Sequence, residues 1–318
     1  SFSCSSSSSS SCSSSSSYIN FLPSSCTGPA THFISHMWVG DFRELVAALQ
    51  VLQGAEYRLD SFPSSPSTLS SSSSSERAKQ NVYVFIDAFC IDQHSSSVSP
   101  SHLASLRSII HAIGRVVGIL WPWDRPRIFT RAWCVFEMFL ALEQQQQQQR
   151  TDAESSSSSS CTASSSSKAT PLRFVMSPTE DSAFVDALQT NASGVSDLHA
   201  TIASSFELDA LQSFFATDRD MILAHLTTDF ARVVEAVLSA NRQWLVDCAM
   251  RALYRQPPLG RAIKPLQSSL GLLCIEVDRM DEARFLLEQA HRELRSEFGV
   301  HHEASIAGQR RLGRLQRA

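Results

Sequence analysis

Short apolar runs alternate with helical stripes over residues 28–178. Four runs have the length and the β-branched and aromatic character of buried strands, at residues 31–35, 82–86, 116–121 and 172–176. Apolar residues recur at helical spacing between these runs, over residues 41–54, over residues 100–114 and from residue 130 onward. Alternating strands and helices indicate an α/β fold, with a doubly wound parallel sheet covered by helices on both faces.

Ser and Gln tracts are inserted into this alternation without interrupting any periodic segment. Such tracts bury too little apolar surface to offset the loss of chain entropy on folding. We therefore predict a disordered Ser-rich segment over residues 1–27. We also predict low-complexity insertions in the α/β domain, at residues 61–80, 95–99 and 144–170. The Gln run at 144–149 is compatible with a longer helix after Thr130.

The pattern is helical throughout from residue 179. Residues 179–256 form a predicted helical linker domain, with amphipathic stripes at 184–188, 206–226 and 229–254. The break at Pro257-Pro258 separates this domain from a last segment, residues 257–318.

An internal repeat marks the last segment. Leu270-Gly271 recurs 42 residues later as Leu312-Gly313. Small residues at Ala283 and Ala290 allow two helices to approach closely. Asp281 is predicted to cap the second helix and Gly299 to end it. The segment resembles tetratricopeptide repeats of the kinesin-light-chain type. Such arrays need three or more repeats, so we expect the array to continue past residue 318 and the chain to be a fragment.

Composition narrows the class of protein. A net charge of −4 does not favour nucleic-acid binding. The eight cysteines form no C-x-x-C pair, and several lie in apolar runs, which favours a reducing, cytoplasmic location. No run of 18 apolar residues predicts a membrane span, and no signal peptide is visible.

The main candidate site is the segment from Thr130 to Glu137, which follows the third predicted strand. Strand ends that lead into helix starts are where open α/β sheets place their sites. Glu137 lies four residues beyond Trp133, so the two side chains are expected to share a helix face. Glu137 either belongs to a functional site or has a structural role as a buried acid that pairs with a local partner such as Arg131.

Three segments together resemble the Toll/interleukin-receptor (TIR) domains and the fungal heterokaryon-incompatibility (HET) domains. The segment His32-Phe33-Ile34-Ser35-His36 is similar to the first TIR strand. Residues 85–93, Phe-Ile-Asp-Ala-Phe-Cys-Ile-Asp-Gln, are similar to the HET motif WIDALCINQ. The pattern Arg131-x-Trp133-x-x-x-Glu137 matches the HET R-x-W-x-x-Q-E motif, with Phe136 in place of Gln, and also the TIR W-C-x-x-E motif. The resemblance implies a TIR-like sheet with flavodoxin-like strand order.

The resemblance also implies a role for Glu137. In enzymatic TIR domains the Glu of W-C-x-x-E is the catalytic acid of NAD cleavage, in which a carboxylate stabilises an oxocarbenium-like ribose. NAD would then be a substrate, and no cofactor is expected. The alternative is that Trp133 fills the core while Glu137 pairs locally. The residues predicted to bind a ligand are Trp133, Asp87, His36, Trp38 and Trp123.

A metal site is not expected, because the spacing of His36, Asp87, Asp92 and His94 matches no known ligand motif. Two functions remain open. The first is a signalling or scaffold protein that self-associates through its α/β domain and binds protein partners through its repeats. The second is an NAD glycohydrolase that uses Glu137.

Overall fold

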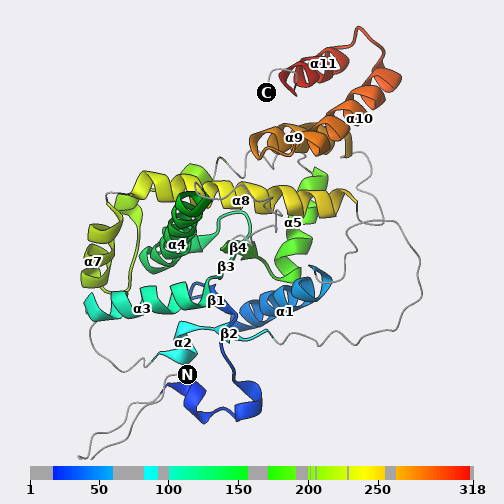
Figure 1. Ribbon diagram of the computed structural model, residues 1–318. Helices are drawn as coiled ribbons and strands as arrows, with labels where there is room; N and C mark the ends of the chain where they lie inside the picture. Colours follow the sequence, from blue (N-terminus) through cyan, green and yellow to red (C-terminus); the bar gives the residue numbers. More distant parts are fainter. Residues whose placement is uncertain are drawn as a thin grey trace, which may run out of the picture.

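A computed structural model describes residues 17–59, 82–91, 100–156, 171–190, 200, 202–204, 206–227, 229–254 and 263–315. Figure 1 shows the strands at the centre of the molecule with helices around them. The predicted insertions at 61–80 and 95–99, most of 144–170, and residues 1–16 lie outside the described residues.

The sheet has four parallel strands. They are β1 (His32–Ser35), β2 (Val84–Phe85), β3 (Val116–Ile119) and β4 (Leu172–Val175), in the order β2-β1-β3-β4. Phe33 pairs with Phe85 on one side and with Val116 on the other. The predicted parallel α/β sheet is confirmed, and its order is that of the first four strands of a flavodoxin-like sheet.

Helices cover both faces of the sheet. Phe33 and Val116 lie in an apolar core with α3 (Pro100–Ile113) and α4 (Ala132–Ser156). Ile34 and Val117 point to the opposite face, where they pack with α1 (Phe42–Leu59). Successive strand residues alternate between the faces, so continuously apolar strands are buried on both sides.

Local signals set some helix ends and not others. Gly114 has φ +73°, the left-handed conformation that ends a helix, and α3 stops just before it. Gly54 was expected to end α1, but the helix continues to Leu59, because glycine weakens a helix interior without breaking it. Residues 144–149, the Gln run, lie inside α4 as a continuation of that helix.

The end of the predicted disordered N-terminal segment is ordered. Residues 18–26 contain two 3₁₀ turns, η1 (Tyr18–Phe21) and η2 (Ser24–Cys26). The Tyr18 ring lies 5.6 Å from the Phe89 ring, between centroids, in the short helix α2 (Asp87–Cys90). Aromatic contact therefore fixes a segment whose composition is otherwise dominated by serine.

The helices after β4 pack onto the sheet or onto the helices that cover it. They are α5 (Pro178–Thr190), α7 (Ala216–Leu226) and α8 (Phe230–Leu253). Helix α8 contacts β4 and α4, and α7 contacts α4. Leu245 and Val246 of α8 belong to the same apolar cluster as Phe33. The described helices of residues 178–253 thus share one core with the sheet.

The first part of the predicted 206–226 helix is not helical. It contains only a 3₁₀ turn, η4 (Leu208–Ala210), before α7. The backbone of Gln212 donates to the Thr130 carbonyl and accepts from the Ala132 amide. This pairing, after η3 (Arg127–Thr130), satisfies backbone groups that a helix would have used internally.

The last three helices extend from α8 away from the sheet (Figure 1). They are α9 (Ile263–Glu276), α10 (Met280–Phe298) and α11 (Glu303–Leu315). A Cβ on Gly271 would lie 2.7 Å from Leu287 Cγ, so the small residue permits the close approach of α9 and α10. Gly299, with φ +82°, ends α10 as predicted. Asp281 does not cap the helix; it lies in the first turn, where its charge favours the helix dipole.

No helix among the described residues is long and apolar enough to cross a lipid bilayer.

Candidate functional site

Three chain segments meet at the carboxyl edge of the sheet. Ser35 is the last residue of β1 and His36 follows it; Asp87 opens α2 directly after β2. Glu137 lies in the second turn of α4, which packs on β1. The parallel order places β1 beside β2, so the loops that follow these two strands are neighbours.

Asp87 is the centre of this cluster. Its Oδ2 accepts a hydrogen bond from Trp38 Nε1 at 3.1 Å, and its Oδ1 accepts one from the Ala88 amide at 2.7 Å. Burial raises the pKa of Asp87, and the nearby His36, together with these two donors, opposes the rise. Burial lowers the pKa of His36 despite the attraction of Asp87, so the imidazole favours its neutral form.

Glu137 is sealed behind this cluster, with 6% of its surface exposed. Burial raises the pKa of Glu137 well above the ordinary value, and the charge of Asp87 raises it further. The Ser35 hydroxyl approaches the carboxyl closely enough to oppose this rise, without the geometry of a full hydrogen bond. A buried carboxyl in these surroundings favours its protonated form.

Cys134 completes the buried part of the cluster. Its Sγ donates to the His36 carbonyl at 3.4 Å, which ties α4 to the loop after β1. Burial raises the pKa of the Cys134 thiol, and the Glu137 charge adds to the effect. A thiol held neutral in this way is a structural group and not a nucleophile.

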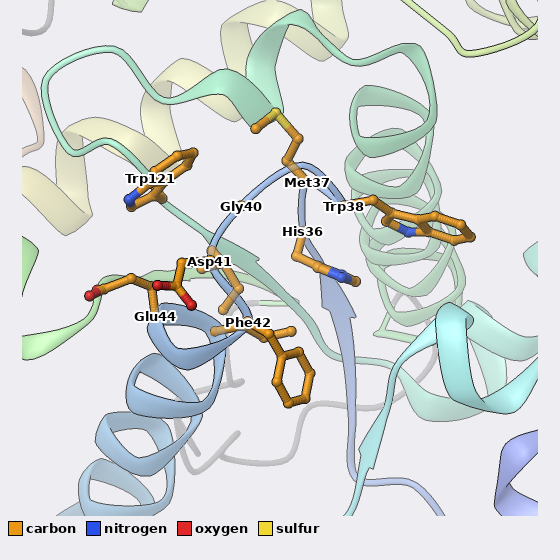
Figure 2. Close-up of a pocket in the computed structure, with 10 residues that line it drawn as sticks. His36, Met37, Trp38, Gly40, Asp41, Phe42, Glu44 and Trp121 are labelled. Carbon is orange, nitrogen blue, oxygen red and sulfur yellow. The ribbon is translucent and has the colours of Figure 1, made fainter.

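A small pocket opens beside the cluster, at the ends of β1 and β3 (Figure 2). Figure 2 shows Trp121 and Glu44 on one side of the loop after β1, and His36 and Trp38 on the other. The pocket has a volume of about 90 Å³. Pockets that enclose drug-sized ligands have roughly 300–1,000 Å³, so this one is too small to enclose a dinucleotide. Glu137 and Asp87 do not line it.

Two of the predicted ligand-binding tryptophans lie elsewhere. Trp133 Nε1 donates to Asp218 Oδ2 of α7 at 3.4 Å, so its indole is engaged by a helix of the later segment. The backbone amide of Trp123 donates to Glu180 Oε2 at 2.6 Å, and its ring meets the edge of Phe184. Trp133 and Glu137 therefore have different polar neighbours, Asp218 for the indole and Ser35 and Asp87 for the carboxyl, and their binding of one ligand stays a prediction.

Sequence reasoning missed a second group of acids at this edge. Glu44 lines the pocket and accepts a hydrogen bond from the Ser177 hydroxyl. Burial raises the pKa of Glu180, the Trp123 amide opposes this, and the charges of Glu44 and Asp124 raise it again. The sequence signal that could have indicated these acids is Ser177, because it follows β4 and polar residues after parallel strands gather at the carboxyl edge of the sheet.

Among the described residues, no group of three or more His, Cys, Asp or Glu side chains has the arrangement of a metal site. Asp92 and His94, two residues weighed as ligands, lie outside the described residues.

Fold and site together define a parallel-sheet α/β protein with a polar, partly buried cluster at the carboxyl edge and a helical extension. Searches with the chain against known protein families, curated proteins and solved structures find no match.

Proposed function

We propose that the protein acts by association: its α/β domain, of TIR/HET-like character, binds further copies, and its helical extension binds protein partners. The observation that carries this proposal is a contrast at the carboxyl edge of the sheet. Glu137 is buried, whereas Trp38, Val39 and Phe42, between β1 and the start of α1, are 57%, 74% and 55% exposed.

These exposed side chains form one apolar edge, which we call the β1–α1 edge (residues 38–42). Phe42 meets the Phe89 ring edge-on at 5.9 Å between centroids, which extends the edge onto α2. Scattered exposed apolar residues are ordinary, but adjacent large ones mark interaction surfaces. Aromatic residues are also enriched at the centres of protein interfaces. The edge therefore favours contact with another protein surface.

Cysteine chemistry is compatible with a cytoplasmic setting for this function. Each cysteine in the described part of the chain is free. Cys134, Cys248 and Cys274 are buried in the apolar core.

Sedimentation velocity of the full chain over a range of protein concentrations tests self-association. We expect the sedimentation coefficient to rise with concentration in the wild type, and to stay at the monomer value when Val39→Ser and Phe42→Ser are combined. Phe285→Ser is the matched control, because Phe285 is as exposed as Phe42 but lies on α10. A wild type that remains monomeric throughout, or equal loss in the control, contradicts the proposal.

The second candidate is NAD glycohydrolysis, favoured by the convergence of Ser35, His36, Asp87 and Glu137. Water would attack the ribose carbon as its bond to nicotinamide breaks, giving nicotinamide, ADP-ribose and a proton. The Glu137 carboxylate would stabilise the ribose cation. Because only 6% of Glu137 is exposed, this chemistry requires the segments around it to move.

Nicotinamide release from NAD by the concentrated wild type and by Glu137→Gln separates the two candidates. The substitution keeps the shape of the side chain and removes its ionisable carboxyl group. Release that Glu137→Gln abolishes favours the enzyme. Absence of release from an assembled wild type contradicts it.

A further inference from the structure

Two phenylalanine side chains project from the molecule at the start of α7. Among the described residues, Phe214 is the most exposed large apolar side chain, at 84%, and its neighbour Phe215 is 55% exposed. The two rings meet edge to face, with their centroids 4.9 Å apart. Burial of an aromatic side chain removes roughly 150–250 Å² from water, and the fold obtains little of this gain from rings that stay so exposed. We call this segment, residues 214–216, the aromatic turn.

The backbone that carries the aromatic turn is held from two sides. Arg219 of α7 donates to the carbonyl of Leu211 through Nε and to the carbonyl of Asp209 through Nη2, both at 2.7 Å. The backbone of Gln212 is hydrogen-bonded to η3 and to the start of α4, at 2.8 and 2.9 Å. The position of the two rings is therefore set before any partner arrives, so binding costs little additional ordering of the chain.

Acidic residues flank the aromatic turn. The Arg219 amide donates to the Phe215 carbonyl at 3.3 Å, and Arg219 Nη1 lies 3.6 Å from Asp220 Oδ1. Because the same side chain binds the Asp209 carbonyl, both acidic residues lie next to the aromatic turn. Asp209 and Asp220 are exposed, and Asp209 makes no ion pair with any residue that the structure describes. Residues 207–220 hold four acids and one base, so this surface is negatively charged (Glu207, Asp209, Asp218 and Asp220 against Arg219).

This charge narrows what can cover the two rings. Two copies of the surface placed face to face would bring like charges together, and an anionic bilayer or a nucleic acid would be repelled in the same way. A surface that supplies apolar side chains with Lys or Arg at their border is complementary to it. An amphipathic helix supplies both. Its side chains three or four positions apart lie about 5–6 Å from each other, close to the 4.9 Å between the two ring centroids.

We propose that the aromatic turn binds a basic amphipathic helix of a partner protein. Aliphatic side chains of that helix cover Phe214 and Phe215, and Lys or Arg side chains at the border of its apolar face pair with Asp209 and Asp220. In Figure 1, α7 lies at the left of the molecule and α9, α10 and α11 lie at the upper right, so this surface is separate from the helical extension. It also shares no residue with the β1–α1 edge. The proposal therefore goes beyond the function proposed above and adds a further contact surface.

Fluorescence anisotropy tests the proposal, with the full chain titrated into a fluorescein-labelled helical peptide of leucine and lysine whose leucines form one stripe. We expect binding that weakens only in part with added salt, because salt screens the ion pairs and not the apolar contact. Combining Phe214→Ser and Phe215→Ser should weaken binding at least about tenfold, as loss of a central aromatic pair does. Combining Asp209→Asn and Asp220→Asn should weaken it about threefold, since exposed ion pairs contribute little. Thermal unfolding of each variant verifies that the fold is kept.

Val39→Ser combined with Phe42→Ser is the matched control, because it removes a comparably exposed apolar pair from the β1–α1 edge. We expect this variant to bind the peptide like the wild type. The proposal is overturned if the wild type does not bind, if the control variant loses as much binding, or if a peptide of the same composition without the leucine stripe binds equally well.

The other possible occupants of the aromatic turn are tested with the same serine variant. The proposal is overturned if Phe214→Ser and Phe215→Ser together abolish self-association in sedimentation velocity, because the occupant is then another copy of the chain. It is equally overturned if they abolish binding to phosphatidylcholine vesicles, because the occupant is then a bilayer. Self-association at the β1–α1 edge is measured without the peptide, so the two proposals can fail separately.

Discussion

Trp38 and Asp87 are hydrogen-bonded across two loops that are 49 residues apart in sequence, with Trp38 Nε1 3.1 Å from Asp87 Oδ2. The bond joins the loop after β1 to the start of α2, directly beside the buried Glu137. The exposed indole therefore holds Asp87, one of the two polar neighbours of Glu137, in place.

Replacing Trp38 with Phe removes the donor and keeps an aromatic ring. We expect the free energy of unfolding to fall by about 1 kcal/mol, the typical contribution of one hydrogen bond. Urea unfolding of Trp38→Phe, Asp87→Asn and the double variant measures the coupling between the two side chains. Strictly additive losses would show that the bond contributes nothing to stability.

Glu137→Gln should change how stability depends on pH. Burial raises the pKa of Glu137 in the folded chain above its ordinary value of 4.5. As pH rises above 4.5, the unfolded chain releases the proton and the folded chain keeps it. The free energy of unfolding of the wild type should therefore fall relative to Glu137→Gln, by up to about 1.4 kcal/mol per pH unit, until the folded pKa is reached.

Glu282→Gln provides a control of opposite sign. The hydrogen bond from Arg279 lowers the pKa of Glu282, so its charge stabilises the fold above the unfolded pKa. That stability is lost as pH falls through the folded pKa. The Glu282 effect falls below the ordinary pKa of 4.5 and the Glu137 effect falls above it. Unfolding curves recorded from well below pH 4.5 to about pH 8 should therefore diverge in opposite directions for the two variants. If the free energy of unfolding has the same pH dependence in the wild type and in Glu137→Gln, the pKa of Glu137 is not raised in the folded chain.

The contact of α9 with α10 depends on the absence of a side chain at Gly271. A Cβ there would lie 2.7 Å from Leu287 Cγ and 3.4 Å from the Ala283 carbonyl oxygen. We expect Gly271→Ala to lower the free energy of unfolding by about 1–3 kcal/mol, as overpacking does. Thermal and urea unfolding would measure the loss.

Gly54→Ala is the comparison for that substitution. Gly54 lies inside α1, and a Cβ at this position meets nothing within 4 Å. Alanine should therefore raise the free energy of unfolding by about 0.5–1 kcal/mol, because it has the better helix propensity. Equal effects of the two substitutions would show that packing at Gly271 is not tight.

Arg279 joins the helical extension to α8. Its Nη1 lies 2.5 Å from Asp247 Oδ1, and its Nη2 lies 2.9 Å from Glu282 Oε1. Both acids are partly exposed, so we expect Arg279→Ala to lower the free energy of unfolding by only about 0.2–1 kcal/mol per pair, and less in high salt. The measurement is urea unfolding at low and high ionic strength. An effect that is unchanged by salt would indicate lost packing in place of lost charge.

Much of the fold follows from local pattern. Continuous apolar runs separated by helical stripes are properties of neighbouring residues, so they predicted the parallel α/β sheet and the helices between its strands. Local chemistry also placed the end of α10, because Gly299 adopts a left-handed backbone conformation that other residues avoid. It did not predict that α1 passes through Gly54, because a glycine inside a helix lowers its stability without ending it.

The motif segments indicated the edge of the sheet where polar groups gather, but not their burial or their partners. Helical spacing put Trp133 and Glu137 on one face, whereas Trp133 bonds to Asp218 of α7, 85 residues later. The packing of α7 on α4 determines this partner, and the periodicity of neighbouring residues in the sequence does not predict that packing. By itself the sequence determined the elements and the edge at which Asp87 and His36 lie. Only the tertiary structure decided that Glu137 is buried and that Trp38 bonds to Asp87, because those contacts depend on strand order and helix packing between distant segments.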